Sequence, residues 1–316
     1  MGAEKGPIRR EPRTVCVVCG GDQWDFVRAG FDLCRPDSAQ EFRLERCLRC
    51  GHIAQCPPPD DDTLTAAYSA GYAPYRPAWK QAGWPLWKIL RELTTRRRLW
   101  RLRRYPSGGR LLEVGSGAGD FLYAANRAGW DVKAVEYSKD LAEALRNELG
   151  FDVRSGELRP GLWEEGQFDL VVLWSVLEHV RDPLETLKTA SAYLRAGGAV
   201  FIQIPTSHGA ELGRSFGQHW ELLELPRHLN FFDKRSLAGL CDKAGMDLVV
   251  FRTPLLDVAW CYLASSVNYA RRSKSALRRQ LRLAALAAMV FAALPWLAYK
   301  AWRGRGTEAF AVAIKR

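Results

Sequence analysis

A glycine-rich stretch, RLLEVGSGAGDFL (110–122), holds the residues best suited to contact a small molecule. Glycines without side chains let a ligand approach the backbone and the N-terminus of a following helix. Glu136 closes the next apolar stretch, DVKAVE, where a carboxylate can bind both hydroxyls of a ribose. The pattern therefore predicts a site for a nucleoside-containing ligand. Its candidate contacts are Glu113, Gly115, Gly117, Gly119 and Glu136.

Four of the eight cysteines form two matched pairs with the spacing of metal ligands. Cys16-Val-Val-Cys19-Gly and Cys47-Leu-Arg-Cys50-Gly each offer two thiolates from one tight turn. Two such turns supply the four sulfurs of a tetrahedral zinc site. That site is closed and structural, because no position is left for a substrate. Free or redox-active cysteines are the alternative interpretation.

The composition is that of a folded protein, with 316 residues, 47% of them hydrophobic, and a net charge of +11. The stretch MGAEKGPIRREPRTV holds no apolar run of a secretory signal, so we expect a cytoplasmic protein. Its cysteines would then be thiols or metal ligands rather than disulfides. The positive charge is compatible with phospholipid head groups, nucleic acid or phosphorylated substrates as partners.

Strands and helices alternate around the glycine-rich turn. Apolar strand patterns at 110–114 and 131–136 are followed by helical patterns, and FDLVVLWS (168–175) and AVFIQIP (199–205) predict further buried strands. A last strand is expected at 308–315. This order predicts an α/β protein with a Rossmann-like, doubly wound parallel sheet, which binds its ligand at the carboxyl ends of the strands.

The region 107–258, together with the last strand, resembles the class I S-adenosylmethionine (SAM) dependent methyltransferases. Glu-Val-Gly-Ser-Gly-Ala-Gly (113–119) is similar to their first motif, and FDLVVLWSVLEHVRDP with AGGAVFIQIP is similar to later ones. The resemblance implies SAM as cofactor, with Glu136 on the ribose and Glu157 and Leu158 beside the adenine. The full set of cofactor contacts that it implies is Glu113, Gly115, Gly117, Gly119, Glu136, Tyr137, Glu157, Leu158 and Trp174.

The zinc ribbon, the link CPPPDDDTLTAAYSAGYAPYRP and the SAM domain follow in an order that resembles one group of bacterial methyltransferases. That group serves surface-polysaccharide and natural-product pathways and includes relatives of sugar C-methyltransferases. Tyr68, Tyr72 and Tyr75 match its tyrosine spacing. They would cover the SAM pocket as a lid, or pack on the domain surface.

The segment LPRHLNFF (225–232) resembles the stretch that carries a catalytic base in sugar C-methyltransferases, and His228 matches that base. A structural role in ordering the loop is the alternative. The tyrosine, histidine and glutamate that precede the base in that family are replaced here by Leu225, Pro226 and Arg227. His208 and His219 are weaker candidates for the base.

Glu178 and His179 follow the fourth strand, at the expected mouth of the pocket. A Glu-x-x-Glu-His cluster binds a divalent ion in quinone-pathway O-methyltransferases, which the local sequence resembles. Ser175 stands here in place of the first glutamate. The pair is therefore expected either to shape the pocket wall or to bind such an ion.

Two further stretches concern partners. RELTTRRRLWRLRRYP (91–106) reads as a basic helix that is either solvated or bound to an acidic partner. Residues 283–299 carry no charge, are interrupted by Pro295 and are flanked by Arg278, Arg279, Arg282, Lys300 and Arg303. A buried helix is one interpretation. We expect instead an in-plane or re-entrant segment at the inner face of the membrane, because a spanning helix would separate the last strand from its sheet.

We thus expect five regions: a zinc ribbon (1–58), a lid or linker with the basic helix (59–106), the SAM-binding domain (107–258), a membrane-leaning helical insertion (259–303) and the last strand (304–316). The expected reaction is methyl transfer to oxygen or carbon of a small or lipid-linked saccharide or secondary metabolite. A zinc-ribbon RNA methyltransferase is an alternative, although the fourth strand ends in LWSVLEHV and not in an Asn/Asp-Pro-Pro-Tyr turn, so we expect no nucleic-acid partner. A non-enzymatic adaptor with a vestigial cofactor fold is the other alternative.

Overall fold

The central sheet has seven strands: β4 (Arg110–Val114), β5 (Asp131–Glu136), β6 (Asp152–Ser155), β7 (Phe168–Trp174), β8 (Leu194–Pro205), β10 (Met246–Arg252) and β11 (Glu308–Lys315). Their spatial order is β10-β11-β8-β7-β4-β5-β6. The computed structural model describes residues 15–35, 40–68, 85–105, 109–212, 216–217, 220–255, 257–258, 261–262, 265, 288 and 291–316. Within them the expected α/β architecture is present.

The sheet is mixed, whereas the sequence predicted a parallel one. Strands β4 to β8 are parallel as expected, but β11 runs antiparallel to both β8 and β10. The direction of β11 follows from the point at which the chain returns to the sheet. Thr253, just after β10, accepts a hydrogen bond from Gly306 N and donates one to Ala301 O, so β11 begins where β10 ends. A strand that starts there can only return in the opposite direction.

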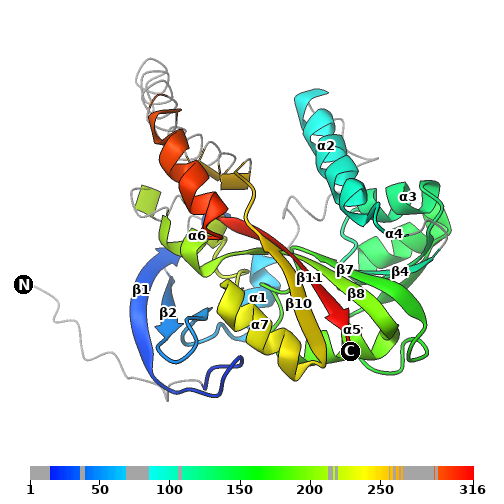
Figure 1. Cartoon of the computed structure of the whole chain (residues 1–316), viewed down its shortest axis with the longest axis horizontal. Coiled ribbons are helices and arrows are strands. Elements are labelled where there is room, and N and C mark those ends of the chain that lie inside the picture. Colours follow the sequence, from blue (N-terminus) through cyan, green and yellow to red (C-terminus); the bar gives the residue numbers. More distant parts are fainter. Residues whose placement is uncertain are drawn as a thin grey trace, which may run out of the picture.

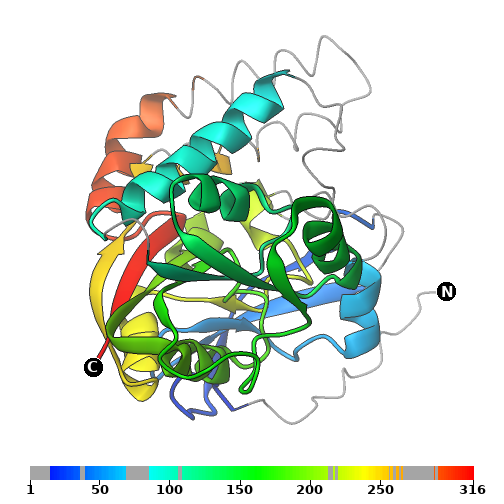
Figure 2. The same ribbon diagram turned by 90° about the vertical axis from the view of Figure 1, so that its right-hand side faces the viewer.

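Helices cover both faces of the sheet, as Figures 1 and 2 show. The helices α2 (Pro85–Leu102), α3 (Asp120–Arg127) and α4 (Lys139–Leu149) pack on one face, and α5 (Pro183–Tyr193) and α7 (Lys234–Lys243) pack on the other. The neighbours Leu111 and Leu112 on β4 are both fully buried, in the cores of opposite faces. Central strands therefore read as continuous apolar runs, because neither side meets water.

A second, antiparallel sheet carries the cysteine pairs. It contains β1 (Trp24–Phe31), β2 (Glu41–Cys47) and β3 (Ile53–Gln55), and its fourth strand is β9 (Asn230–Phe231), from the segment between β8 and β10 of the central sheet. The pairs Ile53–Phe231 and Ala54–Asn230 join β3 to β9. The N-terminal sheet is thus completed by a segment far away in the sequence. The predicted division of the chain at residues 58, 106, 258 and 303 stays a prediction.

A helix over residues 291–302 projects from the same side of the molecule as α2 (Figures 1 and 2). Pro295 lies within this helical stretch. Most of the predicted insertion lies outside the described residues, including Arg278, Arg279 and Arg282, as do Tyr72, Tyr75 and His219. Among the described residues, no helix has the length and apolar character needed to cross a membrane.

Candidate active site and metal centre

The glycine-rich turn links β4 to α3 and needs its glycines for conformation and for space. Gly115, Gly117 and Gly119 have φ angles of 70°, 52° and 76°, in the left-handed region that L side chains rarely adopt. A Cβ at Gly115 would lie 2.7 Å from a methyl group of Val176. Gly119 is the N-cap of α3 and provides no side-chain cap, so the first amides of that helix stay open to a ligand.

Two buried carboxylates flank this turn. Glu136 accepts hydrogen bonds from Gly117 N (2.7 Å) and Ser138 N (2.8 Å), while burial raises its pKa. Burial also raises the pKa of Glu113 well above its usual value, and the charge of Arg98 opposes that shift. Glu113 Oε2 is buried without a hydrogen-bond partner among the described residues. An unsatisfied buried oxygen is costly, so this position fits a ligand that donates a hydrogen bond.

Arg98 on α2 is a site residue that the sequence analysis missed. Its guanidinium lies 5.2 Å from the centre of the Trp174 ring, and its Nε has no hydrogen-bond partner within the described part of the chain. Burial lowers its pKa, whereas the charges of Glu113 and other acids raise it. Glu113 suits an ammonium group and Arg98 suits a carboxylate. A free amino acid carries both of these groups. The donor set therefore fits the methionine portion of SAM.

The remaining predicted cofactor contacts lie along the same edge of the sheet. Tyr137 follows β5 and is exposed, and Trp174 ends β7 with its ring edge-on to Phe121. Glu157 and Leu158 follow β6; the first is exposed and the second is half-buried. The structure thus brings the predicted residues to the carboxyl ends of adjacent parallel strands, where such folds bind ligands. Their individual contacts with SAM stay predictions.

A pair of histidines lies beside this edge. The rings of His179 and His228 are 4.8 Å apart between centroids. His228 Nδ1 is 2.8 Å from the Leu222 carbonyl oxygen, which can only accept, so Nδ1 carries the proton and Nε2 keeps its lone pair. Nε2 lies 3.4 Å from a carboxylate oxygen of Glu224. Burial lowers the pKa of His228 and Glu224 raises it, which leaves a neutral imidazole beside an acid.

His179 is held from two sides. Its Nδ1 is 3.0 Å from the Arg227 carbonyl oxygen and 3.0 Å from the hydroxyl of Tyr68, which follows helix α1 (Asp61–Ala67). Burial, together with the neighbouring His228, lowers the pKa of His179 to about 3. Of the three tyrosines with a predicted lid role, Tyr68 is the one within the described residues. It contacts His179 of the histidine pair.

Glu178 completes a group that could bind a cation. Ligand atoms of Glu178, His179 and His228 all lie within 4.8 Å of one another. Glu178 Oε2 is buried and has no hydrogen-bond partner in the described part of the chain. One carboxylate and two imidazoles suit a divalent transition metal. The third ligand comes from the His228 loop and not from position 175, where the family pattern would place it. Base and ligand are thus alternative roles for His228.

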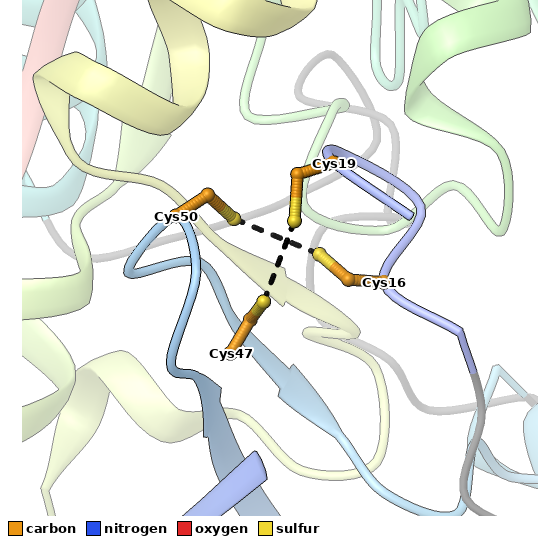
Figure 3. A group of neighbouring side chains, drawn as sticks. All are labelled: Cys16, Cys19, Cys47 and Cys50. Carbon is orange, nitrogen blue, oxygen red and sulfur yellow. Dashed lines mark hydrogen bonds between the residues drawn. The ribbon is translucent and has the colours of Figure 1, made fainter. Parts of the chain in front are cut away.

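The four cysteines of the predicted zinc site point toward a common centre (Figure 3). The sulfurs of Cys16 and Cys50 are 3.7 Å apart, and those of Cys19 and Cys47 are 3.5 Å apart. A tetrahedron with Zn–S bonds of about 2.3 Å has sulfur–sulfur edges of about 3.8 Å. All four are free thiols, so the geometry fits a metal ion and not a disulfide. The hydrogen bond between Cys16 and Cys50 lowers the pKa of Cys16 and raises that of Cys50, so without a metal ion these two thiols share a proton, with Cys16 as the thiolate.

Residues 86–250 match the protein-family model of the methyltransferase domain, over the region that holds these sites. This chain belongs to the SAM-dependent methyltransferases. It is 30% identical over 198 residues to a ubiquinone biosynthesis O-methyltransferase of Ralstonia nicotianae, covering 58% of this chain and 83% of the relative. A protein of the same description from Aromatoleum aromaticum is 28% identical over 54% of this chain and 80% of its own length.

Among solved structures, a phosphoethanolamine N-methyltransferase 2 of Haemonchus contortus in complex with SAM aligns with a TM-score of 0.46 and 18% identity. That alignment covers 70% of the methyltransferase described here and 52% of the other chain. The family assignment rests on the sequence match. The reaction is SAM-dependent methyl transfer to a small-molecule acceptor.

Two features near His228 escaped the sequence analysis. Glu224 stands four residues before His228, a spacing that could have indicated an acid paired with the base. Its φ angle of 35° is strained for a residue with a side chain, and such strain is common at functional sites. The weaker candidate His208 lies near Glu211, at 3.8 Å, and not in the histidine pair.

Proposed function

We propose that this methyltransferase methylates a hydroxyl oxygen of a small, largely apolar acceptor, with His228 as the general base. The supporting observation is the hydrogen bond from His228 Nδ1 to Leu222 O, which keeps Nε2 unprotonated in a buried site. His228 Nε2 takes the hydroxyl proton, and the carboxylate of Glu224 stabilises the resulting imidazolium. When bound, SAM would supply the methyl group of its sulfonium to the acceptor oxygen, with the neutral thioether S-adenosylhomocysteine as the leaving group.

The cofactor would be held by the turn between β4 and α3. Glu113 binds the ammonium group of SAM, Arg98 binds its carboxylate and Glu136 binds the ribose hydroxyls. Glu157 and Leu158 flank the adenine. The unpartnered atoms Glu113 Oε2 and Arg98 Nε support this arrangement, because both groups gain a partner on binding.

Glu136→Ala should weaken SAM binding at least about tenfold, because losing hydrogen bonds to a charged acceptor costs about 1.5–3 kcal/mol. Isothermal titration calorimetry of the purified variant measures this effect. Glu143→Ala is a matched control: this acid lies on α4 and is 3.9 Å from Lys139, on the helix that follows β5. It should bind SAM as the wild type does. Unchanged affinity in Glu136→Ala would contradict the proposed cofactor site.

The acceptor class is inferred from the relatives named ubiquinone biosynthesis O-methyltransferases. A phenolic hydroxyl can give its proton to a neutral histidine of the pair, and an apolar tail suits a buried site. Methylation of a saccharide, on oxygen or carbon, is the second candidate, because a histidine stands at the position of the sugar C-methyltransferase base. Incubation with methyl-labelled SAM and either isoprenyl catechols or nucleotide-linked keto sugars separates the two. If only the sugar is labelled, and on a carbon atom, the proposal of O-methylation of an apolar acceptor is wrong.

We further propose peripheral contact with the inner face of the membrane through the helix over residues 291–302. Its aromatic side chains Phe291, Trp296, Tyr299 and Trp302 are exposed, the first by 77% and the last by 79%. Lys300 lies over the Trp296 ring at 5.1 Å, and Arg303 and Arg305 follow. Exposed aromatic rings beside basic residues suit the head-group region of an anionic bilayer.

The full chain should therefore sediment with anionic liposomes at low salt. Phe291→Ser combined with Trp302→Ser should lower the bound fraction roughly tenfold or more, because two large apolar side chains no longer enter the bilayer. Val249→Ser, at an exposed apolar position on β10, should have no effect. Wholly soluble behaviour would instead indicate a packed helix or a dimer face. Protease protection of the C-terminus in sealed inverted vesicles would indicate a spanning helix.

A further inference from the structure

The strand that follows the second cysteine pair lies against the loop that carries His228. β3 pairs with β9, and just beyond this pairing Gln55 N donates a hydrogen bond of 3.0 Å to Leu229 O. The Leu229 and Asn230 amides in turn donate to the carbonyl oxygen of Glu178. The backbone after His228 is therefore fixed between the cysteine-bearing sheet and the turn that follows β7.

The side chain of Gln55 holds the backbone on both sides of Arg227. Its Nε2 donates to the carbonyl oxygens of Pro226 and His228, each at 2.7 Å, and the residue is 3% exposed. Carbonyls can only accept, so the amide nitrogen must face them. The carbonyl between these two, that of Arg227, points to His179 instead. One amide group thus fixes the local chain direction that presents the two histidines to each other.

The same loop is attached to the cysteine cluster by His52. The His52 ring stacks on Phe232, with centroids 5.0 Å apart and planes 24° from parallel. Its Nδ1 lies 3.6 Å from the sulfur of Cys16. Gly51 packs closely enough that an added Cβ would meet a carboxylate oxygen of Asp233 at 3.1 Å. Together, the second cysteine turn and β3 contact residues at both ends of the segment from 226 to 233.

We propose that Gln55 is a positioning residue through which the four-cysteine metal site fixes the His228 loop for methyl transfer. Residues 224–229 lie between the short helical turn Glu221–Leu223 and β9, and their path depends on the Gln55 side chain together with backbone hydrogen bonds to Glu224 O and Glu178 O. Without the Gln55 amide, two buried carbonyls lose their donors. A displacement of about 1 Å at a catalytic group can lower the rate about 100-fold. The inference rests on the proposed role of His228 as base.

The test compares the zinc-loaded full chain with Gln55→Leu and with wild type stripped of zinc by a chelator. Hydrogen exchange of residues 224–232 should be at least about tenfold faster in both, because Gln55→Leu loses the two side-chain hydrogen bonds to this loop and the zinc-stripped protein loses the fixed position of β3. Gln55→Leu should keep its zinc and its Kd for SAM, yet lose about 10- to 100-fold in kcat. The nitrogen shifts of His228 should change from one tautomer to a mixture. Gln23→Leu, an exposed glutamine of the same sheet region, should match wild type in all readouts.

Wild-type loop protection in Gln55→Leu, or in the zinc-stripped protein, would overturn the inference. The inference would also be wrong if Gln55→Leu has a loosened loop and a normal kcat while His228→Ala is inactive. If His228→Ala retains normal turnover, the failure lies in the proposed base, and the hydrogen-exchange result still decides whether the metal site fixes the loop.

Discussion

His228→Ala is expected to lower kcat about 10²–10⁴-fold, the range for a lost general base, while the Kd for SAM stays unchanged. The imidazole Nε2 lies 3.4 Å from Glu224 Oε2, and alanine can neither take a proton nor be stabilised by that carboxylate. His228 lies in the loop before β9, whereas the glycine-rich turn follows β4, so cofactor binding should survive. Single-turnover kinetics with methyl-labelled SAM and the accepted catechol or sugar measures the effect.

The pH profile provides a second measure of the same role. Burial lowers the pKa of His228 from 6.5, so the neutral base is present at neutral pH. The rate should fall only below pH 6.5, where the imidazolium accumulates, and His228→Ala should lose this acid limb. His208→Ala, outside the histidine pair, is the control and should keep both rate and profile. Near-normal turnover in His228→Ala would leave His228 a structural residue. Loss of a second bound metal ion along with activity would identify it as a ligand.

Combined Cys16→Ser and Cys50→Ser substitutions should remove one tightly bound zinc ion per chain and unfold the N-terminal sheet. Structural zinc contributes an apparent 10–16 kcal/mol, roughly, to the folding of small zinc modules, more than three short strands can replace. The core on the α2, α3 and α4 face of the seven-stranded sheet contains no residue of the N-terminal sheet, whereas the core on the other face also includes Cys16, Cys47 and Cys50. Because the glycine-rich turn leads into α3, SAM binding should be retained. Elemental analysis and calorimetric unfolding measure the two effects.

Cys34→Ser is the matched control for the zinc prediction. Cys34 is exposed and lies near Arg227, with its sulfur 3.2 Å from a guanidinium nitrogen, so serine can still accept that hydrogen bond. This variant should keep its zinc. Freshly purified wild-type protein without zinc would contradict the metal site itself.

Local patterns were sufficient for the parts of the fold in which neighbouring residues act together. The strand predicted at 308–315 and the acids beside the glycine-rich turn are read from periodicity and spacing, and both lie where expected. The four cysteines converge because each pair sits in one turn, and Gly20 and Gly51 give both turns their left-handed residue. These features depend on a few adjacent residues, so the sequence displays them directly.

Features that depend on distant contacts could not be read in this way. Arg96, Arg97 and Arg98 are identical in type, but successive residues of a helix point about 100° apart. Arg96 is exposed, Arg97 pairs with Asp257 and Arg98 lies over Trp174. β9 has only two residues, too few to show the alternating pattern that predicts a strand. These roles can be assigned only from the tertiary contacts in the structure.

The sheet that β9 completes also has a consequence for biosynthesis. Ile53 leaves the ribosome long before Phe231, its pairing partner, has been made. Until then the edge of β3 has unpaired backbone groups, which in a free strand invite association with other chains. Early metal capture by the two cysteine turns would hold the first three strands in a defined arrangement during that interval. β9 then pairs with β3, which is already in place, so the strands of this sheet assemble in the order in which they are synthesised.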